Sequence, residues 1–119
     1  IEHWDVARSQ GRYVGRRIAQ AIDQRRPYDC VPYFFSQLGD WAFMRYVGPG
    51  MGDRVVVRGD MDEGSFAAVY VDGDELVALL AVDHDDDLDA AREALAQHPH
   101  LDLERLADDS VPLRELVRS

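Results

Sequence analysis

The feature that most constrains the fold of this chain is an Asp-Gly step, Asp72-Gly73, between two apolar runs. The run before it, SFAAVYVD, alternates in the manner of a strand, and the run after it, ELVALLAVD, is almost wholly apolar. An Asp-Gly pair between two such runs is a strong local signal for a β-hairpin. The sequence therefore predicts two adjacent antiparallel strands in the middle of the chain.

Two more segments, WAFMRYVG at 41–48 and RVVVRGD at 54–60, also have strand character. Beyond Val82 the pattern becomes helical, with a helix expected to start near Asp86 and to end before Pro99, and Pro112 opens a last short helix. Strands followed by helices indicate an α+β fold. We expect an antiparallel sheet of three to five strands with helices packed on one face.

The first 26 residues form a different unit in this interpretation. Asp5 is expected to cap a helix that runs to about Gln24, and Gly11 and Gly15, four residues apart, predict close approach by a neighbouring segment. Its apolar residues fall largely on one stripe: Val6, Ala7, Val14, Ile18 and Ile22. Pro27 ends this helix, and PYDCVPYFFSQ at 27–37 is interpreted as a proline-bounded aromatic loop. We therefore divide the chain into residues 1–26 and residues 27–119.

Charge and composition exclude several classes of function. The 119 residues carry a net charge of −10, which argues against a surface for nucleic acid or for an anionic membrane. No apolar run reaches the roughly 18 residues that a transmembrane helix needs. The single Cys30 favours a reducing compartment, so we expect a cytoplasmic protein. The first 26 residues hold six Arg and three carboxylates, so a basic helix is attached to an acidic body.

An acidic cluster between Asp83 and Asp89 raises the possibility of a metal site. The cluster lacks the alternating ligands, central Gly and late Glu of an EF-hand, and negative charge is favourable at the start of a helix in any case. We therefore assign no metal ligands, and a small acidic metal- or ligand-binding domain remains an alternative. No nucleophile elbow, Cys pair or carboxylate pair is present, so we assign no catalytic residue.

The order of several short motifs resembles the C-terminal third of FAD-dependent pyridine-nucleotide oxidoreductases of the ferredoxin-reductase type, related to apoptosis-inducing factor. The matching residues are Glu2, His3 and Trp4; Ala7, Gln10, Gly11 and Gly15; Pro27, Tyr28 and Val31 to Ser36; Tyr46 to Gly48; and Val56 to Asp60. The sequence departs from the family at Phe35, where Trp is frequent, and at Gln37, where Asp is frequent. These departures leave the electron acceptor open.

This resemblance implies that the chain is one part of a larger flavoenzyme. FAD and NAD(P)H would be held by upstream domains, with residues 1–26 as the last helix of the FAD-binding domain and residues 27–119 as the reductase C-terminal domain. It implies flavin contact by His3 and Trp4 at the helix start and by Phe34 and Phe35 in the aromatic segment. The isolated chain is then expected to hold no cofactor and to have no activity.

Partners follow from the same interpretation. Arg8, Arg12 and Arg16 share one helix face and are expected to dock an acidic ferredoxin. Apolar surface left without its upstream domains predicts a homo-oligomer, with the helix stripe at Val6, Val14 and Ile18 and the aromatic segment Tyr33 to Phe35 as contact surfaces. The alternative that needs no parent enzyme is a freestanding α+β dimerisation or interaction module.

Overall fold

The computed structural model describes residues 3–118 and has the predicted α+β architecture. The helices are α1 (Trp4–Ala19), α2 (Asp85–Ala94) and α3 (Leu113–Leu116), with single 3-10 turns at Ile22–Gln24 and Leu95–Gln97. The strands are β1 (Tyr33–Leu38), β2 (Ala42–Val47), β3 (Arg54–Asp60), β4 (Ser65–Asp72), β5 (Glu75–Val82), β6 (His100–Leu101) and β7 (Val117–Arg118). Five long strands carry the sheet, and two strands of two residues each extend it beside β5.

Every strand pairing is antiparallel, and the five long strands lie in the order β1-β2-β5-β4-β3. The predicted hairpin at Asp72-Gly73 is confirmed, since β4 and β5 pair from Asp72↔Glu75 onward and Gly73 has a φ of 62°. A register shift at Tyr70/Val71 lets this hairpin bulge near its turn. The central strands predicted within residues 41–82 are therefore all present.

The aromatic segment at 27–37 corrects the sequence interpretation, because its second half is a strand and not a loop. β1 pairs with β2 along its whole length, from Tyr33↔Val47 to Leu38↔Ala42, and Gly39 turns the chain between them with a φ of 64°. Pro27 and Pro32 both precede the strand, so neither removes a ladder hydrogen bond from it. This hairpin adds a fifth long strand at one edge of the sheet.

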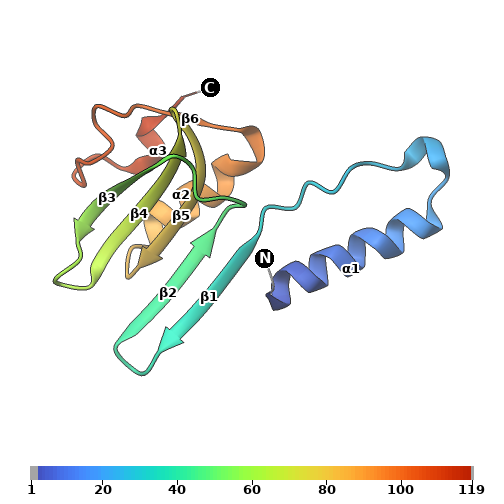
Figure 1. Ribbon diagram of the computed structural model, residues 1–119, viewed down its shortest axis with the longest axis horizontal. Coiled ribbons are helices and arrows are strands. Elements are labelled where there is room, and N and C mark those ends of the chain that lie inside the picture. Colours follow the sequence, from blue (N-terminus) through green and yellow to red (C-terminus); the bar gives the residue numbers. More distant parts are fainter. Residues whose placement is uncertain (1–2, 119) are drawn as a thin grey trace.

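Helices α2 and α3 cover one face of the sheet, and the core lies between that face and the two helices (Figure 1). Val47, Val69 and Leu79 come from three neighbouring strands and are fully buried there. Leu88 and Ala91 of α2 close the core from the other side. α2 begins at Asp85, one residue before the expected start, and α3 follows Pro112 as predicted.

The N-terminal helix lies beside the sheet rather than on it, joined to β1 by the extended segment 25–32 (Figure 1). α1 ends at Ala19, earlier than the predicted Gln24, because Gln20 and Ala21 take extended conformations. Val6 is buried, but Val14, Ile18 and Ile22 are 51%, 75% and 82% exposed. Within the described part of the chain nothing lies within 4 Å of a Cβ built on Gly11 or Gly15, so their predicted neighbour is not a segment of residues 3–118.

Candidate functional site

The start of α1 meets the first strand of the sheet through three aromatic rings. The His3 ring centroid lies 5.6 Å from that of Phe34 and 5.9 Å from that of Phe35. His3, Phe34 and Phe35, three of the four residues expected beside a flavin, thus lie together although 31 positions separate His3 from Phe34 in the sequence. Glu2, the first residue of the matching motif, lies outside the described residues.

His3 reaches this position because it is the N-cap of α1. Its backbone is extended, and its Nδ1 accepts a hydrogen bond from the Asp5 backbone N–H at 3.4 Å. The prediction that Asp5 is the cap is therefore wrong. Asp5 lies in the first helical turn, where its negative charge is still favourable beside the free N–H groups.

Trp4, the fourth expected residue, lies at the first position of α1 and is 65% exposed. The Arg8 guanidinium stands 5.1 Å from the centre of its ring, one helical turn further on. Such a cation–π contact is worth about 0.5–1 kcal/mol at an exposed site. Trp4 therefore links the aromatic helix start to the basic face of α1.

The β1–β2 hairpin continues the aromatic cluster away from α1. Phe34 is directly opposite Tyr46 and stacks on it at 5.1 Å, while Phe35 lies 5.7 Å from Phe43. Phe35 is 49% exposed and Phe43 is 37% exposed. The cluster therefore presents aromatic surface that the described chain leaves open, next to a helix N-terminus.

Tyr46 and Phe43 are residues of this cluster that sequence reasoning missed, and Tyr46 makes the more extensive contacts. The Tyr46 hydroxyl donates a hydrogen bond to the Gly50 carbonyl at 2.6 Å, and the centroid of the Tyr46 ring lies 6.2 Å from that of Tyr70 in an edge-on contact. Burial raises the pKa of the Tyr46 hydroxyl, and Tyr70 adds to the rise, so Tyr46 remains a protonated donor. The β1–β2 register is the signal that would have found it, because that register sets Tyr46 against Phe34.

Arg8, Arg12 and Arg16 are all exposed on α1, as the helical spacing predicts. The segment after α1 folds back on the helix: Tyr28 accepts or donates a 2.6 Å hydrogen bond with Ser9, and the Arg26 carbonyl accepts one from Tyr13 at 2.8 Å. These contacts hold the connecting segment against α1.

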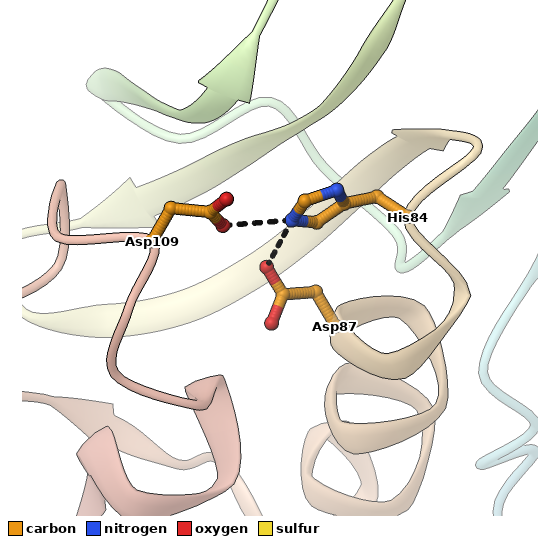
Figure 2. A group of neighbouring side chains, drawn as sticks. All are labelled: His84, Asp87 and Asp109. Atoms are coloured by element: carbon orange, nitrogen blue, oxygen red, sulfur yellow. Dashed lines mark hydrogen bonds and ion pairs between the residues drawn. The ribbon is translucent and has the colours of Figure 1, made fainter.

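A second constellation surrounds Arg58, whose side chain is only 1% exposed. Its Nε donates to Asp87 Oδ2 at 2.7 Å, and its Nη atoms donate to the carbonyls of Leu106, Asp108 and Val111. Figure 2 shows His84 between the two carboxylates beside it, with Nε2 2.8 Å from Asp109 Oδ1 and 3.4 Å from Asp87 Oδ2.

His84, Asp87 and Asp109 bring ligand atoms within 4.8 Å of one another, as a metal site would. The guanidinium of Arg58 already supplies the positive charge next to Asp87, and a cation beside it would be repelled. We interpret this group as a structural ion-pair cluster that ties β3, the start of α2 and the 106–111 loop together. Asp85, Asp86 and Asp87 lie in the first turn of α2, as the capping interpretation of the acidic run expects.

The described residues thus form an α+β domain in which one face of an antiparallel sheet is covered by helices and one sheet edge carries aromatic residues beside the start of α1. The family model described as Reductase C-terminal matches residues 33–117. The chain belongs to this family, and the resemblance noted from its motifs is confirmed.

Similar proteins and similar solved structures agree with this family assignment. The chain is 33% identical over 97 residues to human apoptosis-inducing factor 3, covering 81% of this chain and 15% of that protein. It is 35% identical over 131 residues to the 5,5'-dehydrodivanillate O-demethylase ferredoxin reductase subunit of a Sphingobium species, covering 95% of this chain and 32% of that protein. The chain thus spans about a third or less of these relatives.

A ferredoxin reductase from Rhodopseudomonas palustris has a similar structure, with a TM-score of 0.76 and 30% identity over 90% of this chain and 26% of that chain. Putidaredoxin reductase in its covalent complex with putidaredoxin is also similar, with a TM-score of 0.67 and 26% identity over 76% of this chain and 22% of that chain. Among residues 3–118 no helix is long and apolar enough to cross a membrane.

Proposed function

We propose that this chain is the C-terminal part of an FAD-dependent NAD(P)H oxidoreductase that passes electrons to a ferredoxin-like acceptor. The observation that carries the proposal is the convergence of His3, Phe34 and Phe35 at the start of α1. Residues 27–119 would be the reductase C-terminal domain, and residues 1–26 would be the last helix of the FAD-binding domain. The family match from residue 33 onward supports this division.

The exposed aromatic surface suits one wall of a site for a planar aromatic group. Phe35 offers a half-exposed ring, and the N-terminus of α1 offers N–H groups that favour negative charge. The chain has no glycine-rich phosphate loop of the dinucleotide-binding kind, so other domains would have to hold the phosphates. The residues present therefore fit a contribution to an FAD site and not a whole site.

FAD, when bound, would supply the chemistry of accepting a hydride and releasing electrons singly. His3 and Trp4 would lie at the helix-start side of that site, and Phe34 and Phe35 would exclude water from the strand side. Tyr46 would hold the Phe34 ring in place through the 5.1 Å stack. On this proposal the isolated chain binds no cofactor and has no NAD(P)H oxidase activity.

The test compares the isolated chain with the chain joined to its upstream reading frame. We expect yellow, flavin-containing protein only from the longer form. In that form Phe35→Ala should weaken FAD retention. Phe66→Ala, on strand β4 and away from α1, is the matched control and should leave FAD retention unchanged. Tight FAD binding by the 119-residue chain alone would contradict the proposal.

The exposed arginines of α1 are the proposed docking surface for an acidic ferredoxin. Complementary charge mainly raises the association rate, and about 0.15 M salt, with a Debye length of about 8 Å, weakens it. Replacing Arg8, Arg12 and Arg16 by Gln in the full flavoprotein should slow electron transfer to an acidic ferredoxin at low salt, and the difference should vanish as salt rises.

The matched control replaces three exposed arginines of the acidic body, Arg54, Arg105 and Arg114, by Gln, which changes the net charge equally. Equal slowing by both triple variants would show a general charge effect and would remove the docking role of α1.

The free, exposed Cys30 suits a reducing compartment, so we also propose the cytoplasm as the site of action. Without its parent domains the chain is expected to self-associate.

A further inference from the structure

The Phe35 ring, which the proposed flavin site would use, lies between two other aromatic rings on one face of the β1–β2 hairpin. Tyr33 and Phe35 are two residues apart on β1 and so point to the same side, with ring centroids 6.5 Å apart. Phe43 of β2 is opposite Gln37, beyond Phe35 in the direction away from Tyr33, and its ring centroid lies 5.7 Å from that of Phe35. Phe35 remains 49% exposed, so the two rings flank it without covering it.

Each of the two flanking rings is contacted in turn by a guanidinium group. Arg92 of α2 has its Cζ 4.9 Å from the centre of the Tyr33 ring. Arg45 of β2 has its Cζ 4.9 Å from the centre of the Phe43 ring. A cation at this distance is attracted to the negative face of an aromatic ring. One arginine therefore holds each ring that flanks Phe35.

Arg45 is itself anchored to α2. Its Nη1 lies 3.3 Å from Oδ1 of Asp85, in the first turn of the helix. Its Nε is buried and has no hydrogen-bond partner among residues 3–118. Because an unpaired buried donor is unfavourable, hydrogen bonding of Nε does not account for the position of this side chain. The ion pair with Asp85 and the contact with the Phe43 ring hold the guanidinium in place.

The hairpin depends on such ties because it lies at the edge of the sheet (Figure 1). Among the strands of residues 3–118, β1 pairs with β2 alone. Val47, at the end of β2 away from the turn, is paired with Tyr33 and belongs to the buried core. Phe35 and Phe43 lie nearer the turn and outside that core. The two arginines therefore connect α2 to the part of the hairpin that the core leaves uncovered.

We propose that Arg45 and Arg92 are positioning residues for the proposed flavin site. Arg92 acts through Tyr33 and Arg45 acts through Phe43. Together they hold the Phe35 ring towards the start of α1, where its centroid lies 5.9 Å from that of His3. This role rests on the proposed function, since the ring that the two arginines orient is one of those that would contact the flavin.

The first test uses the 119-residue chain without any cofactor. Nuclear Overhauser effects between the rings of Phe35 and Phe43, and between those of Phe35 and His3, report the position of Phe35. Both should weaken in the double variant Arg45→Met with Arg92→Met. Both should persist in Arg45→Lys with Arg92→Lys, because lysine keeps a cation over each ring. Circular dichroism shows that the variants fold, and unchanged effects in the Met variant would overturn the proposal.

The second test measures FAD binding by the longer form that includes the upstream reading frame. Arg45→Met and Arg92→Met should each raise the FAD dissociation constant about twofold to fivefold, as loss of one exposed cation–π contact would. In a Phe35→Ala background the same substitutions should have no further effect, because the ring through which they act is absent. The matched control is Arg114→Met, which removes an ion pair with Glu93 at 3.6 Å and should leave FAD binding unchanged.

The outcomes separate this role from the proposed function. If Phe35→Ala does not weaken FAD retention in the longer form, the proposed flavin contact fails, and the positioning role fails with it. If Phe35→Ala weakens retention and the arginine variants do not, the positioning role alone is overturned. A full further loss from Arg45→Met in the Phe35→Ala background would also overturn it, because the arginine would then act by another route.

Discussion

Arg58 and Asp87 form a buried ion pair, with Arg58 Nε 2.7 Å from Asp87 Oδ2 and the two side chains 1% and 7% exposed. One residue comes from β3 and the other from the first turn of α2. The remaining donors of the guanidinium bond backbone carbonyls in the 106–111 loop. A single side chain thus joins three segments that are distant in sequence.

Removing this guanidinium should destabilise the domain strongly. We expect Arg58→Met to lower the free energy of unfolding by about 3–5 kcal/mol, because Asp87 is left as an unpaired buried charge and the carbonyls lose their donor. Urea denaturation followed by far-UV circular dichroism measures the loss.

The double variant Arg58→Met with Asp87→Leu removes both charges and should recover part of that loss. The matched control Arg54→Met, an exposed arginine on the same strand, should change stability by less than about 0.5 kcal/mol. Equal losses for Arg58→Met and Arg54→Met would contradict a structural role for the pair.

Gly59, which follows Arg58, should not tolerate a side chain. Its φ is 83°, and an added Cβ would lie 2.5 Å from the Ser65 carbonyl oxygen. We expect Gly59→Ala to cost about 2–4 kcal/mol, from left-handed strain together with the clash. Gly64→Ala provides the comparison, because Gly64 has a φ of 72° but open space around it.

Gly64→Ala should cost only the strain of about 1–2 kcal/mol. Thermal unfolding of the two variants separates the contributions. A Gly59→Ala protein no less stable than Gly64→Ala would show that β4 moves aside without cost.

Tyr46 should contribute more through its ring than through its hydroxyl. Tyr46→Phe removes the hydrogen bond to Gly50 and should cost about 0.5–1.5 kcal/mol, while the stack on Phe34 persists. Tyr46→Ala removes both and should cost about 3–5 kcal/mol. Near-ultraviolet circular dichroism should change little in the first variant and strongly in the second. Equal spectra for both would mean that Tyr46 does not order the Phe34 ring.

The hydrogen bond from His100 lowers the pKa of the Asp74 carboxyl below its usual value of about 3.9. The folded chain then binds this proton less readily than the unfolded chain. The contribution to stability is complete above the usual carboxyl pKa and is lost as the pH falls through the lowered pKa of the folded state.

We therefore expect His100→Gln to raise the Asp74 pKa towards its usual value and to reduce the loss of stability on acidification below about pH 4. Titration of the Asp74 carboxyl carbon by NMR, with urea midpoints at each pH, measures both effects. An unchanged Asp74 pKa in His100→Gln would show that the hydrogen bond at 2.9 Å does not cause the shift.

Local sequence determined most of the elements of this fold. The hairpin at Asp72-Gly73, the start of α2 near Asp86 and the short helix after Pro112 depend on contacts within a few residues, and all three are present. Turn chemistry and apolar periodicity act over the same short range, which is why they could be predicted.

Long-range pairing decided the rest. β1 is a strand because Tyr33 to Leu38 find partners in β2, which the aromatic composition of that segment does not specify. Tyr46 joins the candidate site only through that register. Arg58 is buried because partners 29 to 53 residues away converge on it.

The sequence by itself determined the family, the α+β class and the basic helix attached to an acidic body. Only the tertiary structure decided which faces are covered, since α2 takes one side of the sheet and the described chain provides no helix for the other. The physical reason is that periodicity tells which residues share a face, while burial of that face depends on elements that are remote in sequence.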